Sequence, residues 1–417
     1  MRKGSGMTAS ATDLSDRLWK RVALALPSHL DHVVEARGFR DDRTFDVDVA
    51  IVTNCSFPGG NASTTLEELR AFREADLEVV LIHCPVRGSP WKRWRVAERY
   101  LEETASIVPA HRVREVRCRT LIVRGPRMVM TDNFRRLAPK LRSRKAVFVV
   151  NNSAWSENGK PIFDWEALCD RVGSLGWNAE ICPTGPIVRA EADRALGGKT
   201  DAGPLSDRDW PPAFDPDAFE FAPRAVLSDP VVIGRHGRDH PGKWLEDPDA
   251  LLVVYPEEGP VHVRVMGGAD TARDILGREP SGWDVLPFGA TGVEDYLASL
   301  DVFVYFPSSW RHEAFGRTIV EALLAGLPVV LPHRFRATFG DLAFYCEPED
   351  VRDVVQRLRE DDEGRLAYLH AARALAIDLF GSPSLIRRLD DTAGDAVPRL
   401  SEQHRRFKLG IEGGAQR

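Results

Sequence analysis

The sequence predicts an α/β protein of two domains, each built on a doubly wound parallel sheet. Short apolar runs rich in β-branched residues alternate with helical patterns along almost the whole chain, which is typical of parallel sheets. The length of 417 residues fits two domains, since one domain usually takes about 100–200 residues. Between Trp210 and Pro230 the chain has five prolines, which cannot lie in a continuous helix or a central strand. We expect this segment to be the linker between the domains.

Strands are expected throughout the first domain, and a helix from about Thr64 follows the first strand. Thr64 and Glu67 have the spacing of a capping box at the start of this helix. No G-x-G-x-x-G follows any of the strands, which disfavours a dinucleotide-dependent dehydrogenase. The expected strands are Val49–Thr53, Leu77–Cys84, Thr120–Val123, Ala146–Val150 and Ala179–Cys182.

The alternation restarts after the proline-rich segment. We expect a helix at Val293–Leu300 with Thr291 and Glu294 as a capping box, and another at Gly316–Ala325 closed by Gly326. The segment from Asp247 is ambiguous, because its β-branched residues indicate a strand whereas Asp247 and Pro248 indicate a helix start. The expected strands are Pro230–Gly234, Val261–Gly267, Trp283–Gly289, Asp301–Pro307 and Leu327–Pro332.

The composition excludes several classes of protein. With 43% hydrophobic and 28% charged residues the chain resembles an ordinary soluble protein, and its net charge of −6 gives no general attraction to nucleic acid. The six cysteines stand alone, which argues against zinc and a disulfide framework and for a reducing compartment. The N-terminal stretch lacks the apolar region of a signal peptide, and no apolar run approaches the roughly 18–20 residues of a membrane span. We therefore expect a cytoplasmic protein.

The loop GRHGRDHPGKW, Gly234–Trp244, matches the phosphate-binding P-loop up to its last position. There Trp244 replaces the Ser or Thr that would hold magnesium, and Pro248 interrupts the helix that should follow, so a P-loop is disfavoured. Arg235 and Lys243 instead flank a glycine-rich bend after a strand, and two such cations suit a diphosphate. A solvated basic loop without a ligand is the alternative at this point.

A second motif lies in SSWRHEAFGRTIVEALLAGLPVVLP, Ser308–Pro332. Glu313 and Glu321 have E-x7-E spacing, with A-F-G after the first and A-G-L-P-V-V after the second. Together with the upstream G-R and Lys, this stretch resembles the retaining GT-B glycosyltransferases of the large family 4 class (glycosyl transferases group 1). The resemblance is specific over residues 229–360. Over the first domain it is general, and consists of the alternation and the two glycines after the first strand.

The resemblance implies a GT-B fold of two Rossmann-like domains facing across a cleft. It implies a hexosyltransferase-type enzyme of polysaccharide biosynthesis that moves a sugar from a UDP- or GDP-linked donor to a glycan, lipid-linked or small-molecule acceptor, with retention and without metal or cofactor. A sugar-nucleotide epimerase or hydrolase of the same fold, and a non-catalytic nucleotide-sugar-binding partner protein, are the alternatives. The expected domain limits are 1–44 for an N-terminal helical extension, 45–225 for the acceptor-side domain, 226–380 for the nucleotide-sugar-binding domain, and 381–417 for a C-terminal helix and polar tail.

The resemblance also assigns roles to residues. Glu313 would hold donor-sugar hydroxyls, Arg235 and Lys243 would neutralise the leaving diphosphate, and Glu321 would bind the ribose. Both glutamates also have structural interpretations, Glu321 in a capping box with Thr318 and Glu313 as a complement to the helix dipole. The other expected donor-binding residues are Gly59, Gly60, Phe315, Gly316 and Arg317.

Four further residues are candidate sugar or acceptor contacts. Asn151 and Asn152 follow an expected strand, where loop residues often face a ligand. Arg311 and His312 lie in an insertion of two residues relative to the family pattern, for which a surface bulge is an equal alternative. Three Asp-x-Asp pairs, beginning at Asp46, Asp215 and Asp247, are interpreted as structural, so no metal site is expected.

A basic aromatic segment lies in the first domain. A packed amphipathic helix with a solvated basic face is the favoured interpretation, and peripheral contact with anionic lipid headgroups at the inner face of the membrane is the alternative. The residues concerned are Trp91, Lys92, Arg93, Trp94 and Arg95.

Overall fold

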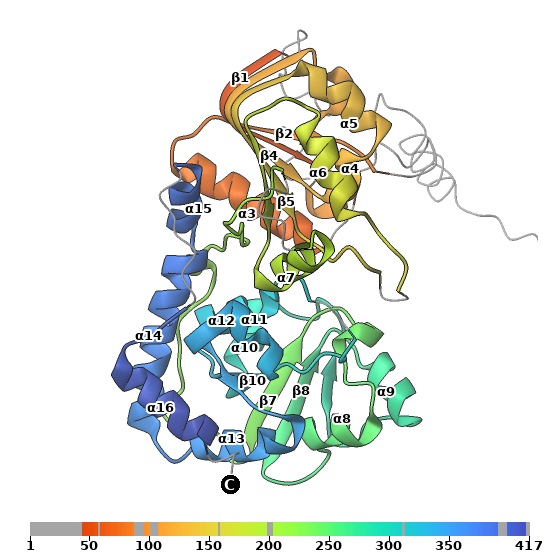
Figure 1. Cartoon of the computed structure of the whole chain (residues 1–417). Coiled ribbons are helices and arrows are strands. Elements are labelled where there is room, and N and C mark those ends of the chain that lie inside the picture. Colours follow the sequence, from red (N-terminus) through yellow and green to blue (C-terminus); the bar gives the residue numbers. More distant parts are fainter. Residues whose placement is uncertain are drawn as a thin grey trace, which may run out of the picture. The chain divides into compact units, whose positions relative to one another are not determined.

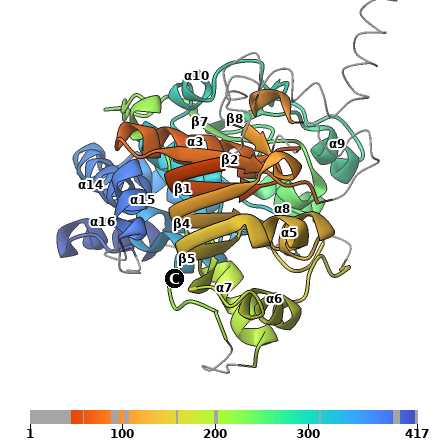
Figure 2. The same ribbon diagram turned by 90° about the horizontal axis from the view of Figure 1, so that it is seen from above.

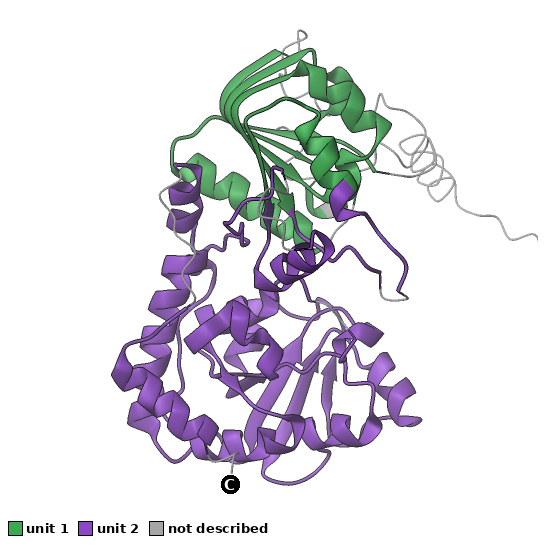
Figure 3. Ribbon diagram, viewed as in Figure 1, with its two compact units in different colours: residues 1–149, 167–181 green, residues 150–166, 182–417 purple. Residues whose placement is uncertain are grey.

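The computed structural model divides the chain into two compact units (Figure 3). Unit 1 comprises Met1–Val149 and Ala167–Ile181, and unit 2 comprises Val150–Glu166 and Cys182–Arg417. The expected N-terminal extension, the basic aromatic segment Trp91–Arg95, and the pair Arg311 and His312 lie outside the described residues. The structure describes residues 44–56, 59–86, 96–100, 107–156, 159–197, 203–310, 313–390 and 398–413.

Unit 1 contains a six-stranded sheet in the order β3-β2-β1-β4-β5-β6 (Figure 1). Neighbouring strands run parallel, and Val49–Thr53 at the centre is buried on both faces, as its continuous apolar run predicts. The five expected strands are present. Among the described strands of this sheet, the sequence analysis missed β3, whose three residues are too short for a periodic pattern. The strands are β1 Thr44–Thr53, β2 Val79–His83, β3 Ile107–Pro109, β4 Glu115–Arg124, β5 Leu141–Val150 and β6 Ala179–Pro183.

The helix after β1 begins earlier than expected. Helix α3 starts at Gly60, with Gly59 as its N-cap and no side-chain cap, so the expected capping box of Thr64 and Glu67 is wrong. Thr64 is instead buried, and α3 packs along β2 (Figure 2). The helices of this part of the chain are α3 Gly60–Glu74, α4 Pro126–Val129, α5 Asp132–Leu137 and α6 Trp165–Gly173.

Unit 2 repeats the same topology in its own six-stranded sheet, β12-β11-β10-β7-β8-β9. Counted from its own first strand, each sheet has the order 3-2-1-4-5-6 of doubly wound nucleotide-binding folds. The expectation of two Rossmann-like parallel sheets is therefore confirmed. The strands are β7 Val231–His236, β8 Val261–Met266, β9 Asp284–Leu286, β10 Val302–Val304, β11 Val329–Leu331 and β12 Phe344–Tyr345.

The helices of unit 2 resolve two sequence expectations. The ambiguous segment is helix α8, capped by the Asp247 side chain, which accepts a hydrogen bond from the Asp249 amide. Helix α10 begins after Gly292 without a side-chain cap, so the expected capping box of Thr291 and Glu294 is wrong. The helices are α7 Pro186–Ala195, α8 Pro248–Val254, α9 Asp270–Leu276, α10 Val293–Ala298, α11 Arg317–Ala325, α12 Arg336–Phe339, α13 Val351–Leu358, α14 Asp362–Phe380, α15 Ser382–Leu389 and α16 Glu402–Glu412.

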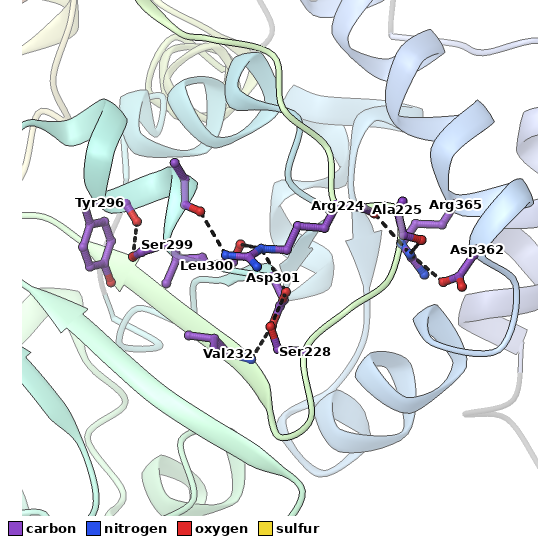
Figure 4. Close-up of polar contacts among 11 residues, drawn as sticks. Arg224, Ala225, Ser228, Val232, Tyr296, Ser299, Leu300, Asp301, Asp362 and Arg365 are labelled. Carbon is purple, nitrogen blue, oxygen red and sulfur yellow. Dashed lines mark hydrogen bonds and ion pairs between the residues drawn. The ribbon is translucent and has the colours of Figure 1, made fainter.

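The proline-rich segment is fastened to unit 2 along its second half (Figure 4). Arg224 donates hydrogen bonds to the carbonyls of Leu300 and Ala298, each at 3.1 Å, and its Nε lies 3.1 Å from a carboxylate oxygen of Asp301. Asp301 also accepts a hydrogen bond from the Val232 amide at 2.7 Å. Buried Arg365 on α14 donates to the Arg224 carbonyl at 3.3 Å. The segment is thus a packed part of unit 2.

Side-chain contacts also join the two segments of unit 2, Val150–Glu166 and Cys182–Arg417. The carboxylate of Glu191 on α7 accepts hydrogen bonds from the Ser153 hydroxyl at 2.7 Å, the Ala154 amide at 2.6 Å and Trp165 Nε1 at 3.2 Å. One carboxylate therefore joins the chain after β5 to α7. Such long-range contacts leave no local pattern in the sequence.

Candidate functional site

The topology of the second sheet indicates where a ligand binds. The strand order reverses between β7 and β10, since β8 and β9 continue on one side and β11 and β12 on the other. Ligands of open parallel sheets bind outside the carboxyl ends of the strands at such a reversal. Lys243 follows β7 and Glu313 follows β10, so both expected residues belong to loops at this edge.

Lys243 and Glu313 are brought together at this edge. The Lys243 Nζ atom lies 2.5 Å from Glu313 Oε2, and it also donates to the Tyr305 hydroxyl at 2.9 Å. The Tyr305 hydroxyl in turn donates to Glu313 Oε2 at 2.9 Å. The side chains of Lys243 and Glu313 are 20% and 15% exposed, whereas Tyr305 is buried. A partly buried cation and a partly buried anion are therefore held together by a buried phenol, which the sequence analysis did not single out.

Helix α11 begins at Arg317, four residues after Glu313, with Gly316 as its N-cap. Gly316 has φ +99°, a backbone conformation that favours glycine, and a Cβ at this position would lie 2.8 Å from Cδ1 of Ile319. No side chain caps the helix, and the alternative capping box of Thr318 and Glu321 is not formed. The first amides of a helix have no partner within it and attract anions. The start of α11 is thus suited to a phosphate.

Glu321 lies one turn into α11 between two basic side chains. Its Oε1 is 3.4 Å from Nη2 of Arg317, and its Oε2 is 3.3 Å from Nε2 of His236, the last residue of β7. Burial, followed by the charges of three neighbouring cations, lowers the pKa of His236 to about 3. The imidazole is therefore neutral near pH 7, and its contact with Glu321 is not an ion pair. The sequence analysis missed His236.

Arg235 does not lie where a phosphate contact was expected. It belongs to β7, is 1% exposed, and its guanidinium lies 4.1 Å from the ring centroid of Trp244. Its Nη1 donates a hydrogen bond to the Lys243 carbonyl. The preceding Gly234 serves strand packing, because a Cβ there would lie 2.4 Å from the Arg264 carbonyl oxygen. The first Gly-Arg pair of the loop is therefore part of the core.

A second Gly-Arg pair forms the loop itself. Gly237 has φ +142°, and Arg238 directly after it is exposed, beyond the end of β7. A Cβ on Gly267, in the loop after β8, would lie 1.7 Å from the Gly237 carbonyl oxygen, so these two backbones touch. Arg238 is the exposed arginine of this loop and was missed by the sequence analysis. The sequence does contain a pattern that marks Arg238 as a candidate, because Gly-Arg occurs twice before Lys243.

Phe315 and Arg317 flank Gly316 in different ways. The Phe315 ring is buried against Phe339 and Phe380, with ring centroids 5.8 and 5.3 Å away. The Phe315 side chain therefore belongs to the core. Arg317 lies over the Phe214 ring at 4.4 Å and beside Glu321.

The remaining candidates belong to other parts of the chain. Gly59 and Gly60 begin α3 in unit 1, at the carboxyl end of β1. Asn152 donates from its side-chain amide to the Ser153 carbonyl at 2.8 Å, next to Asn151 after β5. Their roles as donor or acceptor contacts stay predictions.

The Asp-x-Asp pairs have structural partners. Asp247 and Asp215 each cap a helical turn. Their side chains accept hydrogen bonds from the amides of Asp249 and Asp217, respectively, both at 3.0 Å. Asp48 accepts the Glu78 amide at 2.9 Å. Within the described ranges, no group of three or more His, Cys, Asp or Glu side chains is arranged to hold a metal ion.

Among the described helices, none combines the length and the apolar character that crossing a bilayer requires.

The fold resembles solved glycosyltransferases. An Anabaena protein, Alr3699/HepE, whose structures contain UDP with glucose or UDP-glucose, aligns with a TM-score of 0.57 at 16% identity over 83% of this chain and 99% of that one. A glycosyltransferase from Rickettsia africae aligns with a TM-score of 0.54 at 12% identity, over 86% and 100% of the two chains. An alpha-glucosyltransferase bound to UDP and a 13-mer DNA also has a TM-score of 0.54 at 12% identity, over 83% and 99%.

These similarities show the fold, which is the GT-B fold of glycosyltransferases. No protein-family model matches the sequence, and no curated protein sequence matches it.

Proposed function

We propose that this protein is a metal-independent glycosyltransferase that moves a sugar from a nucleotide diphosphate sugar to an acceptor hydroxyl, with retention of configuration. The observation that carries the proposal is the pair of Lys243 and Glu313 at the reversal point of the second sheet. A cation beside a carboxylate at a helix N-terminus can bind a phosphate and a sugar hydroxyl side by side. The GT-B fold supports this proposal, because the Anabaena protein of similar fold binds UDP with glucose or UDP-glucose.

The donor diphosphate would lie against Lys243, Arg238 and the first amides of α11. Arg238 takes this place in the proposal in preference to Arg235, because only Arg238 is exposed at the edge. The exposed face of this cation pair would stabilise the charge that develops on the leaving diphosphate, which is the largest contribution in many transfer reactions. No metal or cofactor is needed for that step in the proposal.

The two carboxylates would bind hydroxyl groups at the two ends of the donor. Glu321 would accept hydrogen bonds from the ribose, and Glu313 would accept them from the sugar. The retaining course and the assignment to a family 4-like, hexosyltransferase-type enzyme of polysaccharide biosynthesis rest on the E-x7-E resemblance. An acceptor that is a glycan, a lipid-linked sugar or a small molecule stays open, as does peripheral membrane contact through Trp91–Arg95.

Binding and turnover experiments test the proposal. Calorimetric titration with UDP, GDP and ADP should give binding to at least one nucleotide, and Glu321→Ala should weaken it. Glu360→Ala, at an exposed position between α13 and α14, is the matched control and should bind as wild type does. If none of the nucleotides binds, or Glu321→Ala leaves binding unchanged, the donor site is wrong.

A second measurement separates the alternatives. Sugar transfer that requires an added acceptor supports a transferase. Release of free sugar without acceptor indicates a hydrolase, interconversion of the donor indicates an epimerase, and nucleotide-sugar binding without any turnover indicates a binding partner.

A further inference from the structure

The last residues of β7 place a buried cation directly behind the proposed donor site. Arg235 is one of the largest fully buried side chains in the part of the chain that the structure describes. Its Nε has no hydrogen-bond partner among the described residues. A buried charge is costly unless its surroundings compensate it. The contacts of this guanidinium therefore call for an explanation beyond packing.

Those contacts lead to both halves of the site. Nη1 donates to the carbonyl of Lys243, and the guanidinium lies over the ring of Trp244, the next residue. On the other side it lies 5.3 Å from the ring centroid of Tyr305, whose hydroxyl holds Lys243 Nζ and Glu313 Oε2. One side chain thus contacts the backbone of Lys243 and the ring whose hydroxyl fixes the Lys243 ammonium.

The surroundings of Arg235 are themselves fixed. Trp244 Nε1 donates to Asp239 at 2.8 Å, and the Trp244 ring stacks on Trp283 with centroids 5.8 Å apart. The Arg235 carbonyl accepts a hydrogen bond from the Tyr296 hydroxyl at 2.7 Å. A planar guanidinium can stack on a ring and donate to a carbonyl at once, which an ammonium cannot do in the same geometry.

We propose that Arg235 is a positioning residue, which sets the Lys243 ammonium for the donor diphosphate through the Lys243 carbonyl and the Tyr305 ring and does not itself touch substrate. This inference rests on the proposed function and deepens it. Arg235, which the sequence motif predicted to contact the diphosphate, thus has an indirect role. Reaction rates are more sensitive than binding to such an alignment, since a displacement of about 1 Å can cost about 100-fold in rate.

The test uses Arg235→Lys, which keeps the charge but loses the planar fork. We expect kcat to fall by about 10- to 100-fold, while the Kd for UDP changes by less than about threefold. Arg365→Lys is the matched control, because Arg365 is an equally buried arginine that donates to carbonyls on α13 and the segment before β7. It should lose thermal stability without loss of kcat. Tyr305→Phe, which removes one hydroxyl, gives a second variant with the same expected loss of kcat if Arg235→Lys fails to fold.

A double-mutant cycle decides whether Arg235 acts through Lys243. In a Lys243→Gln background, Arg235→Lys should cost no further kcat, because the group that it positions is gone. Three results would overturn the inference. The first is a loss of kcat from Arg235→Lys in the Lys243→Gln background that is as large as in wild type. The others are a wild-type kcat in Arg235→Lys alone, or a rise in its Kd for UDP as large as that of Arg238→Ala. If Lys243→Gln and Arg238→Ala themselves leave UDP binding and transfer unchanged, the proposed function fails, which is a different result.

Discussion

The Lys243 Nζ atom lies 2.5 Å from Glu313 Oε2, although the two residues are 70 positions apart in the chain. They meet because β7 and β10, which lead into their loops, are neighbours in the sheet. The buried Tyr305 hydroxyl contacts both groups at 2.9 Å and fixes their separation. The pairing of opposite charges at this edge is therefore a product of the topology.

Replacing Lys243 with glutamine should reduce sugar transfer by about 100-fold or more, because removal of one preorganised charge-stabilising group has that effect on kcat. Glutamine can still donate a hydrogen bond to Glu313, so the loop should keep its conformation. Steady-state kinetics with the donor that the titrations identify measure the change. Lys160→Gln, at an exposed position of unit 2, is the control. A Lys243→Gln rate within about twofold of wild type would remove Lys243 from the mechanism.

Arg238→Ala should raise the Kd for UDP by about tenfold, or roughly 1.4 kcal/mol, the scale of one charge-assisted hydrogen bond partly screened by solvent. Its effect should shrink as salt is raised from about 0.05 to 0.5 M, since exposed charges are screened. Arg352→Ala on α13, also exposed, should leave the Kd unchanged. Unchanged UDP affinity in Arg238→Ala at low salt contradicts the assignment of this residue to the diphosphate.

Much of this fold was predictable from local patterns. The buried parallel strands appear in the sequence as continuous apolar runs, and Gly326 closes α11 in the left-handed conformation as expected. The E-x7-E spacing singled out Glu313 and Glu321, and their roles in donor binding stay predictions. The two capping boxes were wrong because Gly59 and Gly292 begin those helices, and a capping pattern does not say which turn is first.

The choice between Arg235 and Arg238 could not be made from the sequence. Each follows a glycine within the same loop motif, and only the end of β7 at His236 decides which one is buried. Tyr305 and the contact between His236 and Glu321 depend on the strand order of the sheet, which no single stretch of sequence encodes.

His236 should make stability depend on pH. Its pKa of about 3 in the folded protein lies below the ordinary value of 6.5, so the unfolded chain binds more protons between those values. Stability is therefore lost as the pH falls below 6.5, and at pH 5 the loss from this one group is about 2 kcal/mol. In urea unfolding at pH 7 and pH 5, His236→Gln should show a smaller difference than wild type. Equal differences would mean that the pKa of His236 is the same in the folded protein as in the unfolded chain.

Gly267→Ala should damage both stability and donor binding. A Cβ at residue 267 would lie 1.7 Å from the Gly237 carbonyl oxygen, and the residue has φ +124°, so the loop that carries Arg238 must move. Gly277→Ala is the matched control, because it also has a positive φ, +68°, but nothing lies within 4 Å of the added Cβ.

We expect Gly277→Ala to cost about 1 kcal/mol of backbone strain without change in UDP affinity. We expect Gly267→Ala to cost at least about 3 kcal/mol and to weaken UDP binding. Thermal unfolding and calorimetric titration of both variants give the comparison. If Gly267→Ala is destabilised yet binds UDP as wild type does, the contact between the β7 and β8 loops supports the fold alone, and Arg238 does not depend on it.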